Sequence, residues 1–448
     1  MRAHLRVMVA AIIATIGTVV VGTSTIWAPP AQADPPSRTP QLGEVFNGFV
    51  VGAFQSGRLA SPQEIFTPLT SGDAFYNEPT LRGDEKAGTL LKAKKVDVQF
   101  TGYRPGNLDA YKLMYVTRGL HGEPDISTGI LMVPRDGRDN ATRPVVGYQF
   151  ANDSVGAYCH PSTMWTGGDP LDGASWSALG PLAQMFGKGY AVMISDVGND
   201  GDTTPHGVFA GKFAGNTLLD GLRAALSHNP AGLSAAAPVS LFGIAGGGVG
   251  AAFAAENAST YAPELNIKGT VLEGMVVNQR NFIRTADGSL GSGFAFATLL
   301  GLEPRYPEMR IDEKLTPAGK ALADVFRTQC QTPAYFGTPF LPLKTLFRNG
   351  QNPADIADFQ PVYRDNLLGT RSPKAPVLIA SCAADDSPMS LVPAADARTL
   401  ARKYRSGGTR VDYQPTDCGM VNFMTNLYGW GTDLFGMQTI DWMSARLK

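Results

Sequence analysis

The sequence predicts an α/β fold, built on a doubly wound, mostly parallel sheet with a helical insertion. Three observations support this prediction. Apolar runs typical of strands alternate with helix-like stretches from about residue 96 to the C-terminus. The glycine-rich segment 243–247 joins one such run to a helix-like stretch. Residues 277–369 interrupt the alternation with several helical pieces, as expected of an insertion between two core strands.

Several predicted strands are continuous apolar runs, which is typical of central strands buried on both faces of a parallel sheet. The spacing of Leu218, Leu222 and Leu226 predicts a helix over 216–227 with one apolar side. Strands are expected at 96–101, 111–117, 129–133, 145–150, 191–195, 239–243, 269–273, 377–381 and 410–414. Other helices are expected at 248–255, 392–404 and 432–447, and within the insertion at 294–302, 317–328 and 341–347.

The first 33 residues have the features of a secretory leader, because Arg2 and Arg6 precede an apolar run over 7–21. Residues 31–33 (Ala-Gln-Ala) then supply the small side chains that signal peptidase requires. We therefore expect cleavage near Ala33 and a secreted or envelope-associated protein. An uncleaved anchor is the alternative, although the apolar run is short for a membrane span. The predicted parts are a leader (1–33), the first part of the core (34–276), a helical cap (277–369) and the rest of the core (370–448).

Charge and cysteine content narrow the functional classes. The formal net charge is −1, and loss of Arg2 and Arg6 with the leader would bring it to about −3. This balance, without basic runs, argues against a nucleic-acid partner. All four cysteines follow the leader, and an even number in an exported chain favours two disulfides. No clustered His/Cys spacing indicates a metal site, and we expect neither a metal nor another cofactor.

The stretch Gly243-Ile244-Ala245-Gly246-Gly247 is similar to the nucleophile elbow of the α/β-hydrolase fold. In that fold a G-x-S-x-G turn between strand and helix holds the nucleophilic serine in a strained conformation. Glycines flank the serine because strand and helix converge too closely there for side chains. Here the glycine frame is present, but Ala245 occupies the serine position. The turn therefore predicts an α/β-hydrolase fold, but it lacks the nucleophilic serine.

The order of motifs resembles the secretory lipase family, whose members are secreted α/β-hydrolases that cleave triacylglycerols and other esters. Residues 243–248 fit the family's G-Y-S-G-G-G, with Ile244 in place of tyrosine and Ala245 in place of serine. Segments 73–79 with 88–91, 148–154 with 159–162, 189–192 leading to Asp196, and 219–225 are also similar to the family, in the same order.

The resemblance implies positions for the remaining catalytic groups. Asp385, after the predicted strand 377–381, lies where the family has its catalytic acid and would be a vestige of it. Asp386 is an adjacent alternative. The oxyanion donors would be the Gly246 amide and a group near Asp153. The catalytic histidine should follow the strand 410–414, but residues 415–422 contain none.

The histidines that the chain does contain all precede the elbow, and His228 is the last. We expect surface-loop positions for His160, His206 and His228. A serine trap made by substitution would keep its histidine, so the double loss indicates natural loss of serine-hydrolase chemistry.

The sequence thus predicts a catalytically inactive, secreted relative of lipases that binds a lipid or acyl ligand, or acts in the cell envelope. An active lipase or carboxylesterase with an unrecognised nucleophile is the alternative. Dinucleotide binding is a weaker one: 246–251 satisfies G-x-G-x-x-A, and Glu273 ends the next strand where a ribose-binding acid would lie. Nothing in the sequence indicates the oligomeric state.

Two further expectations concern the cap. A Cys159–Cys330 pair resembles one in the family and would tie the cap to the oxyanion-side loop, which leaves Cys382 to pair with Cys418. That second bond would join the loop of the acid to the loop that lacks the histidine. Within the cap, the apolar residues Phe294, Phe296, Leu299 and Leu300 are expected to face the space above Ala245.

Overall fold

The computed structural model describes residues 43, 47–66, 73–100, 102–151, 155–167, 172–199, 207, 209–227, 230–330, 337–384, 391–419 and 437–448. Ser37–Lys448 form one compact unit. The predicted leader lies outside the described residues. Within the described residues, no helix combines the length and apolarity needed to cross a membrane.

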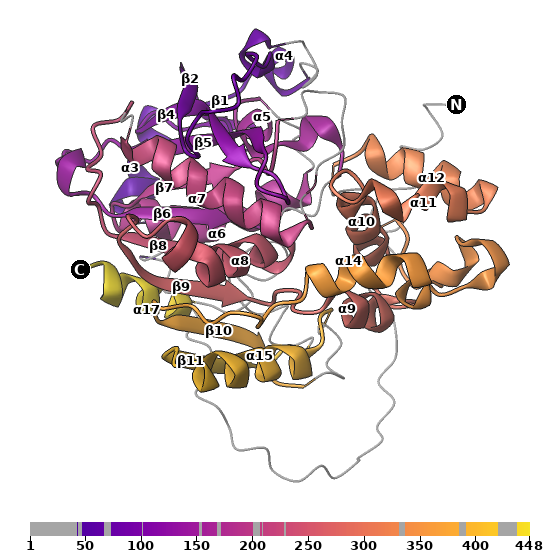
Figure 1. The fold of residues 1–448 in the computed structure, drawn as a ribbon. Helices are drawn as coiled ribbons and strands as arrows, with labels where there is room; N and C mark the ends of the chain where they lie inside the picture. The colour runs from indigo at the N-terminus through magenta and orange to yellow at the C-terminus, as the bar shows by residue number, and fades with distance from the viewer. Residues whose placement is uncertain are drawn as a thin grey trace, which may run out of the picture. The chain divides into compact units, whose positions relative to one another are not determined.

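A nine-stranded sheet organises the core, in the order β11-β10-β9-β8-β6-β7-β5-β4-β2 (Figure 1). The pairs from β11 to β7 are parallel, and β7, β5, β4 and β2 pair antiparallel. The α/β-hydrolase prediction is therefore confirmed for the fold. The strands are β2 (Leu90–Val96), β4 (Leu108–Arg118), β5 (Pro124–Pro134), β6 (Val145–Gln149), β7 (Ala191–Ser195), β8 (Val239–Ile244), β9 (Ile267–Glu273), β10 (Val377–Cys382) and β11 (Val411–Thr416).

Helices cover both faces of this sheet, as a doubly wound fold requires. α7 (Gly211–Ser227), α8 (Ala245–Tyr261) and α15 (Ala394–Ser406) bury their apolar residues in the larger of two main core clusters. α6 (Gly173–Gly187) and α17 (Met437–Leu447) pack on the opposite face in the second cluster. The predicted helix 216–227 is thus the C-terminal part of α7.

The insertion between β9 and β10 is helical, and Figure 1 shows its orange helices grouped outside the layers of the core. Its α10 (Ser292–Leu302) contacts α9 (Gln279–Ala286) and α12 (Pro317–Arg327). Phe296, Leu299 and Leu300 are at most 1% exposed and belong to the larger cluster, whereas Ala245 packs against the other one. α10 is apolar on all sides and almost entirely buried. Whether these side chains face the space above Ala245 stays a prediction.

Two sequence predictions of local structure fail. Of the predicted strand 96–101, only Val96 lies in a strand, as the last residue of the edge strand β2, and Phe100 forms an isolated bridge with Tyr103. β2 was missed because an edge strand carries lysines, here Lys92, Lys94 and Lys95, and so lacks an apolar run. The predicted helix 341–347 is reduced to one short 3₁₀ turn.

The remaining elements are short. They are α3 (Gly48–Ser56), β1 (Arg58–Leu59), α4 (Pro62–Phe66), η1 (Ala74–Tyr76), β3 (Tyr103–Arg104), η2 (Asn140–Thr142), η3 (Ala157–Cys159), α5 (Pro161–Met164), η4 (Pro307–Met309), α11 (Ile311–Lys314), η5 (Leu343–Thr345), η6 (Arg348–Gly350), η7 (Pro353–Asp355), η8 (Ala357–Phe359) and α14 (Gln360–Asp365).

Candidate functional site

The turn between β8 and α8 has the backbone of a nucleophile elbow. Ile244 ends β8 in an extended conformation (φ −122°, ψ 138°), and Ala245 begins α8 with φ 50°. A left-handed conformation costs an L-residue roughly 1–2 kcal/mol, and such strain persists only where the surrounding structure imposes it. Ala245 is half-buried, so its methyl group remains partly accessible. The turn thus has the strained backbone of a nucleophile elbow, but alanine occupies the position of the nucleophilic serine.

The glycines around Ala245 are explained by contacts. A Cβ on Gly247 would lie 2.1 Å from the Phe150 carbonyl oxygen, at the end of β6. A Cβ on Gly243 would lie 2.5 Å from Cβ of Ala251, in the second turn of α8. Strand, helix and the neighbouring loop therefore converge too closely for any side chain at these two positions.

The first turn of α8 offers backbone donors beside Ala245. The first amides of a helix, here including that of Gly246, have no acceptor within the helix. The N-cap residue Ile244 has an apolar side chain and makes no capping hydrogen bond, and the helix dipole adds partial positive charge at this end. The turn also lies at the topological switch point, because β6 pairs with β7 on one side and with β8 on the other. Asp153, the predicted oxyanion-side residue, lies outside the described residues.

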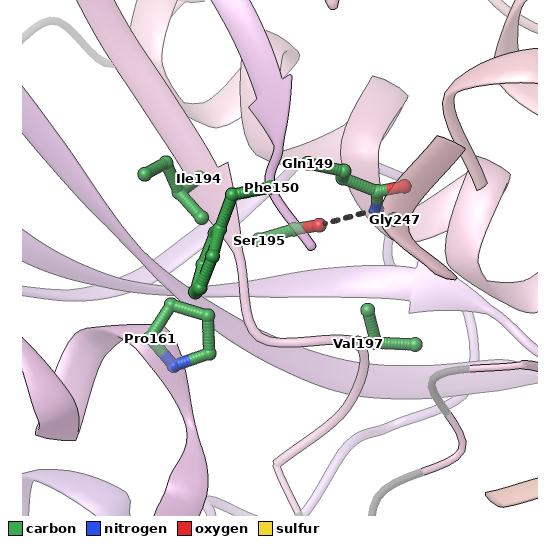
Figure 2. Close-up of a pocket in the computed structure, with 7 residues that line it drawn as sticks. All are labelled: Gln149, Phe150, Pro161, Ile194, Ser195, Val197 and Gly247. Atoms are coloured by element: carbon green, nitrogen blue, oxygen red, sulfur yellow. Dashed lines mark hydrogen bonds between the residues drawn. The ribbon is translucent and has the colours of Figure 1, made fainter. Parts of the chain in front are cut away.

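A small cavity lies between the end of β6, the end of β7 and Gly247 (Figure 2). Its volume of about 10 Å³ would hold about one water molecule. Gln149 Nε2 donates to Ser195 Oγ at 3.0 Å and to the Ala214 carbonyl oxygen at 3.1 Å, which fixes the end of β6 against β7 and α7. This cavity is too small for an acyl chain.

Both predicted disulfides are present. Cys159 bonds to Cys330, with a Cα–Cα distance of 5.5 Å, and so joins the segment after β6 to the segment after α12. Cys382 bonds to Cys418, also at 5.5 Å, and joins the ends of β10 and β11. Asp385 and its neighbour Asp386 lie outside the described residues, so their role as a vestigial acid stays a prediction.

Two of the five histidines are described. His121 is exposed in the turn between β4 and β5. His160 is 1% exposed, so the surface-loop expectation is wrong for it. Cys159 and Pro161 fix its backbone at the start of α5, which packs on β5 and β7. These strands lie beyond β6 from the elbow, whereas the loops for acid and base follow β10 and β11. His206 and His228 lie outside the described residues.

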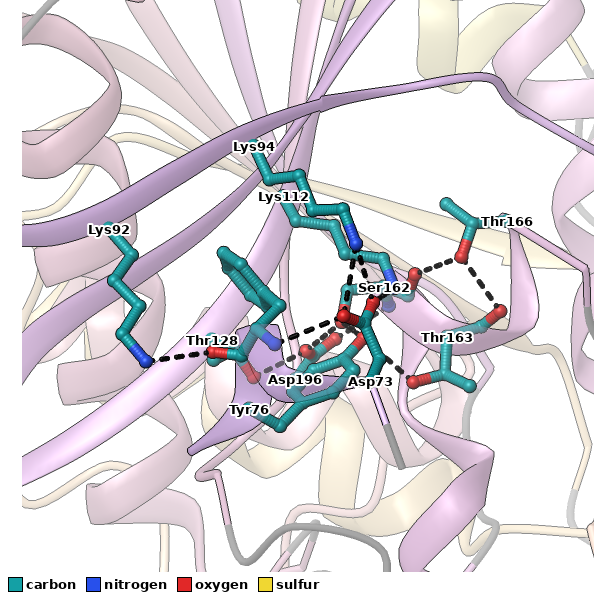
Figure 3. A network of polar contacts seen from close by, with 11 residues as sticks. Asp73, Tyr76, Lys92, Lys94, Lys112, Thr128, Ser162, Thr163, Thr166 and Asp196 are labelled. Carbon is teal, nitrogen blue, oxygen red and sulfur yellow. Dashed lines mark hydrogen bonds and ion pairs between the residues drawn. The ribbon is translucent and has the colours of Figure 1, made fainter. Parts of the chain in front are cut away.

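A buried polar network holds the segment around Ser162 (Figure 3). Asp196, after β7, accepts hydrogen bonds from the Ser162 amide at 2.8 Å and from Thr128 Oγ1 at 2.6 Å, and the Ser162 hydroxyl also donates to it. The Tyr76 hydroxyl lies 2.7 Å from Ser162 Oγ. Ser162 and Asp196 are fully buried. Ser162 is therefore inaccessible to an ester carbonyl, and the network is structural.

Lys112 extends this network toward the surface. Its Nζ lies 4.8 Å from the centre of the Tyr76 ring and 3.3 Å from Asp73 Oδ2. Burial lowers the pKa of Lys112, and Asp73 opposes that shift. Burial and the nearby charge of Asp196 raise the pKa of Tyr76. Sequence reasoning missed Lys112 because a single lysine within an apolar strand carries no motif.

The glycines of the dinucleotide-like motif serve packing. The Phe150 carbonyl occupies the space next to Gly247 that a pyrophosphate would need, and a Cβ on Gly250 would lie 2.1 Å from Gln149 Oε1. Glu273 is fully buried, so it is not placed to contact a ribose in a crevice. The described geometry thus gives the dinucleotide alternative no support.

Comparison with known proteins agrees with this fold and turn. The secretory lipase family matches residues 179–448. A probable inactive lipase of Mycobacterium tuberculosis is 30% identical over 364 residues, which cover 77% of this chain and 76% of that protein. A secreted triacylglycerol lipase of Malassezia globosa is 29% identical over 354 residues, covering 76% and 72%. The closed state of Candida antarctica lipase A has a similar fold, with a TM-score of 0.67 and 24% identity over 78% of this chain and 81% of that one. The chain therefore belongs to the secretory lipase family.

Proposed function

We propose that this protein is a secreted, non-hydrolysing member of its family that binds an acyl-chain ligand, a lipid or an ester, at the elbow. The observation that carries the proposal is Ala245. Its backbone has the left-handed conformation of a nucleophile elbow, and its side chain is a methyl group that cannot attack a carbonyl. A strained position without a nucleophile is expected in a protein that has kept the fold of a hydrolase and lost the hydrolytic reaction.

The absence of a histidine from the sequence after residue 228 supports the loss of hydrolysis. Ser-type hydrolysis requires a base within hydrogen-bonding reach of the nucleophile and an acid that orients the base. The end of β11, where the base is expected, instead carries Cys418 bonded to Cys382. This covalent bond holds the two loops together without the acid–histidine hydrogen bond of a working triad.

Ligand binding can survive the loss of hydrolysis, because the groups that bind an ester differ from those that attack it. The first-turn amides of α8 remain beside the half-buried Ala245 and favour a carbonyl or carboxylate oxygen. The substrate class follows from the relatives, which include secreted triacylglycerol lipases and one probable inactive lipase. The leader-like N-terminus and two disulfides support export, followed by a role outside the cell or in its envelope.

Two measurements on the purified mature chain test the proposal. We expect no turnover of p-nitrophenyl butyrate above the buffer rate, and co-purification of an acyl-containing molecule after incubation with a total lipid extract, identified by mass spectrometry. Ala245→Trp, which replaces the partly accessible methyl group of the turn with a bulky ring, is expected to abolish that capture. Arg402→Gln, an exposed change on α15, serves as the control and should retain it.

The outcomes separate the alternatives. Turnover at the rate of an ordinary lipase would instead support an active enzyme with another nucleophile. No turnover, and lipid capture that is absent or equal in wild type and Ala245→Trp, would remove ligand binding at the elbow and leave a purely structural role in the envelope.

A further inference from the structure

A second, larger cleft lies between α7, α8, the turn from β4 to β5 and residues 370–371. Its volume is about 500 Å³, within the range of pockets that hold small molecules. The side chains that matter for its chemistry are Arg118, Asn216, Asn257, Thr260 and Arg371. Such a mixture of guanidinium, amide and hydroxyl groups suits a polar, anionic ligand.

This cleft is separate from the elbow. Both border α8, but Ala245 begins that helix and Asn257 lies twelve residues further along it. At 1.5 Å per residue the two positions are about 18 Å apart along the helix axis. The cleft is therefore a site distinct from the elbow and from its proposed acyl ligand.

The two arginines of the cleft are available to a ligand. Among the described residues, no carboxylate forms an ion pair with Arg118 or Arg371. Arg371 donates to Asn257 Oδ1 at 3.0 Å and to Thr260 Oγ1 at 3.4 Å. Arg118 donates one Nη to the Glu85 carbonyl oxygen at 2.6 Å. Each guanidinium is thus oriented by neutral acceptors and keeps its positive charge and further N–H donors.

Buried Glu256 holds the segment that carries Arg371. Its carboxylate accepts hydrogen bonds from the Gly369 amide at 2.7 Å, the Arg371 amide at 3.2 Å and the Tyr404 hydroxyl at 2.7 Å. Glu256 lines the cleft but is only 3% exposed, and burial raises the pKa of its carboxyl group, which these donors offset only in part. The backbone at Arg371 is therefore fixed before any ligand arrives, which lowers the entropic cost of binding.

We propose that this cleft binds a phosphorylated polyol. Guanidinium groups match the geometry of phosphate oxygens and form charge-assisted hydrogen bonds with them. The Asn216 and Asn257 amides and the Thr260 hydroxyl supply donors and acceptors for the hydroxyls of a polyol. A volume of about 500 Å³ exceeds what a bare phosphate would fill. The ligand is either a free sugar phosphate or the headgroup of a phosphorylated polyol lipid.

Calorimetric titration of the purified mature chain with myo-inositol 1-phosphate tests the proposal, with inorganic phosphate and myo-inositol as reference probes. We expect saturable binding of the phosphate ester that is tighter than binding of either reference and weakens as salt is raised. Arg371→Gln should weaken binding by about tenfold or more, the effect of one lost charge-assisted hydrogen bond. Arg402→Gln, an exposed charge-matched change on α15, should leave it unchanged.

Thr260→Trp, which places a bulky ring in the cleft from the exposed end of α8, provides a second variant and should abolish binding. Sedimentation with phosphatidylinositol vesicles, against phosphatidylcholine vesicles, distinguishes the two sources of the ligand. The proposal would be overturned if the protein bound neither myo-inositol 1-phosphate nor phosphatidylinositol vesicles. It would also be overturned if wild type, Arg371→Gln and Thr260→Trp bound equally well. Binding of phosphate as tight as that of the ester would overturn its polyol part.

Discussion

At the scale of a single residue, the protein is defined by a strained alanine. Ala245 has φ 50° at a turn where a Cβ on Gly243 or Gly247 would clash with neighbouring atoms. In an active relative the strain would expose a nucleophile. Here the same backbone strain presents no nucleophile, because the methyl group of Ala245 cannot form a covalent bond with a substrate.

Ala245→Gly is therefore expected to stabilise the protein. Relief of the left-handed conformation should gain roughly 1–2 kcal/mol, and the greater freedom of glycine in the unfolded chain should cost about 0.5–1 kcal/mol. We expect a net gain of about 0.5–1 kcal/mol in the free energy of unfolding, measured by urea denaturation. Ala258→Gly, in the same helix at ordinary φ, should destabilise by a similar amount. Destabilisation by Ala245→Gly would mean that the turn is not strained.

Ala245→Ser alone should not restore hydrolysis. A serine hydroxyl needs a base, and the loss of one triad member costs several powers of ten in rate. Turnover of p-nitrophenyl butyrate by the variant should match that of the wild type. Activity near that of a working lipase would reveal a base that the chain's five histidines do not suggest.

At the scale of elements, charged groups attach the segment around η1 to the antiparallel end of the sheet. Asp73 accepts hydrogen bonds from the Phe75 amide at 3.0 Å and from Lys94 at 3.0 Å, and Lys112 pairs with it from β4. Burial raises the pKa of Asp73, but these donors outweigh it and lower the pKa to about 2. η1 in turn carries Tyr76, whose hydroxyl joins the buried network of Ser162.

This depressed pKa predicts a pH dependence. A carboxyl group with a lower pKa in the folded than in the unfolded state stabilises the fold above its unfolded pKa, here 3.8. That contribution is lost as the pH falls from about 4 to about 2. Asp73→Asn should therefore be less stable than wild type at pH 7, and the difference should shrink toward pH 2. Urea denaturation across this range measures it, and a constant difference would contradict the assignment.

At the scale of the whole molecule, two disulfides connect distant parts of the chain. Cys159–Cys330 closes a separation of 171 residues and ties the helical insertion to the core, whereas Cys382–Cys418 closes 36 residues within the core. The bonds therefore differ in how much freedom they remove from the unfolded chain. They also differ in place, since one crosses between insertion and core and the other joins neighbouring parallel strands.

The chain-entropy account predicts a ranking of the two bonds. It assigns roughly 5 kcal/mol to the longer separation and about 4 kcal/mol to the shorter one. Cys159→Ala/Cys330→Ala should therefore destabilise more than Cys382→Ala/Cys418→Ala, by about 1 kcal/mol, in denaturant unfolding of the oxidised proteins. Equal losses, or the reverse order, would show that native-state contacts outweigh loop closure.

The sequence by itself determined the fold class, the elbow and the absence of a serine and a histidine from their expected positions. Continuous apolar runs identified most core strands, because strands buried on both faces have no alternative composition. The glycines around Ala245 identified the turn, since only a close approach of backbones requires them there. The absence of the serine and the histidine can be recognised from the sequence alone, because each has a fixed place in the order of strands and helices.

The tertiary structure decided what depends on contacts between distant residues. Edge strand β2 and buried His160 escaped prediction because their environments are set by partners far along the chain. The composition of α10 predicts that it is buried, but only the tertiary structure identifies α9 and α12 as the helices that pack against it. The cleft that contains Arg118 and Arg371 exists only where four separate segments meet, and proximity in space leaves no pattern in sequence.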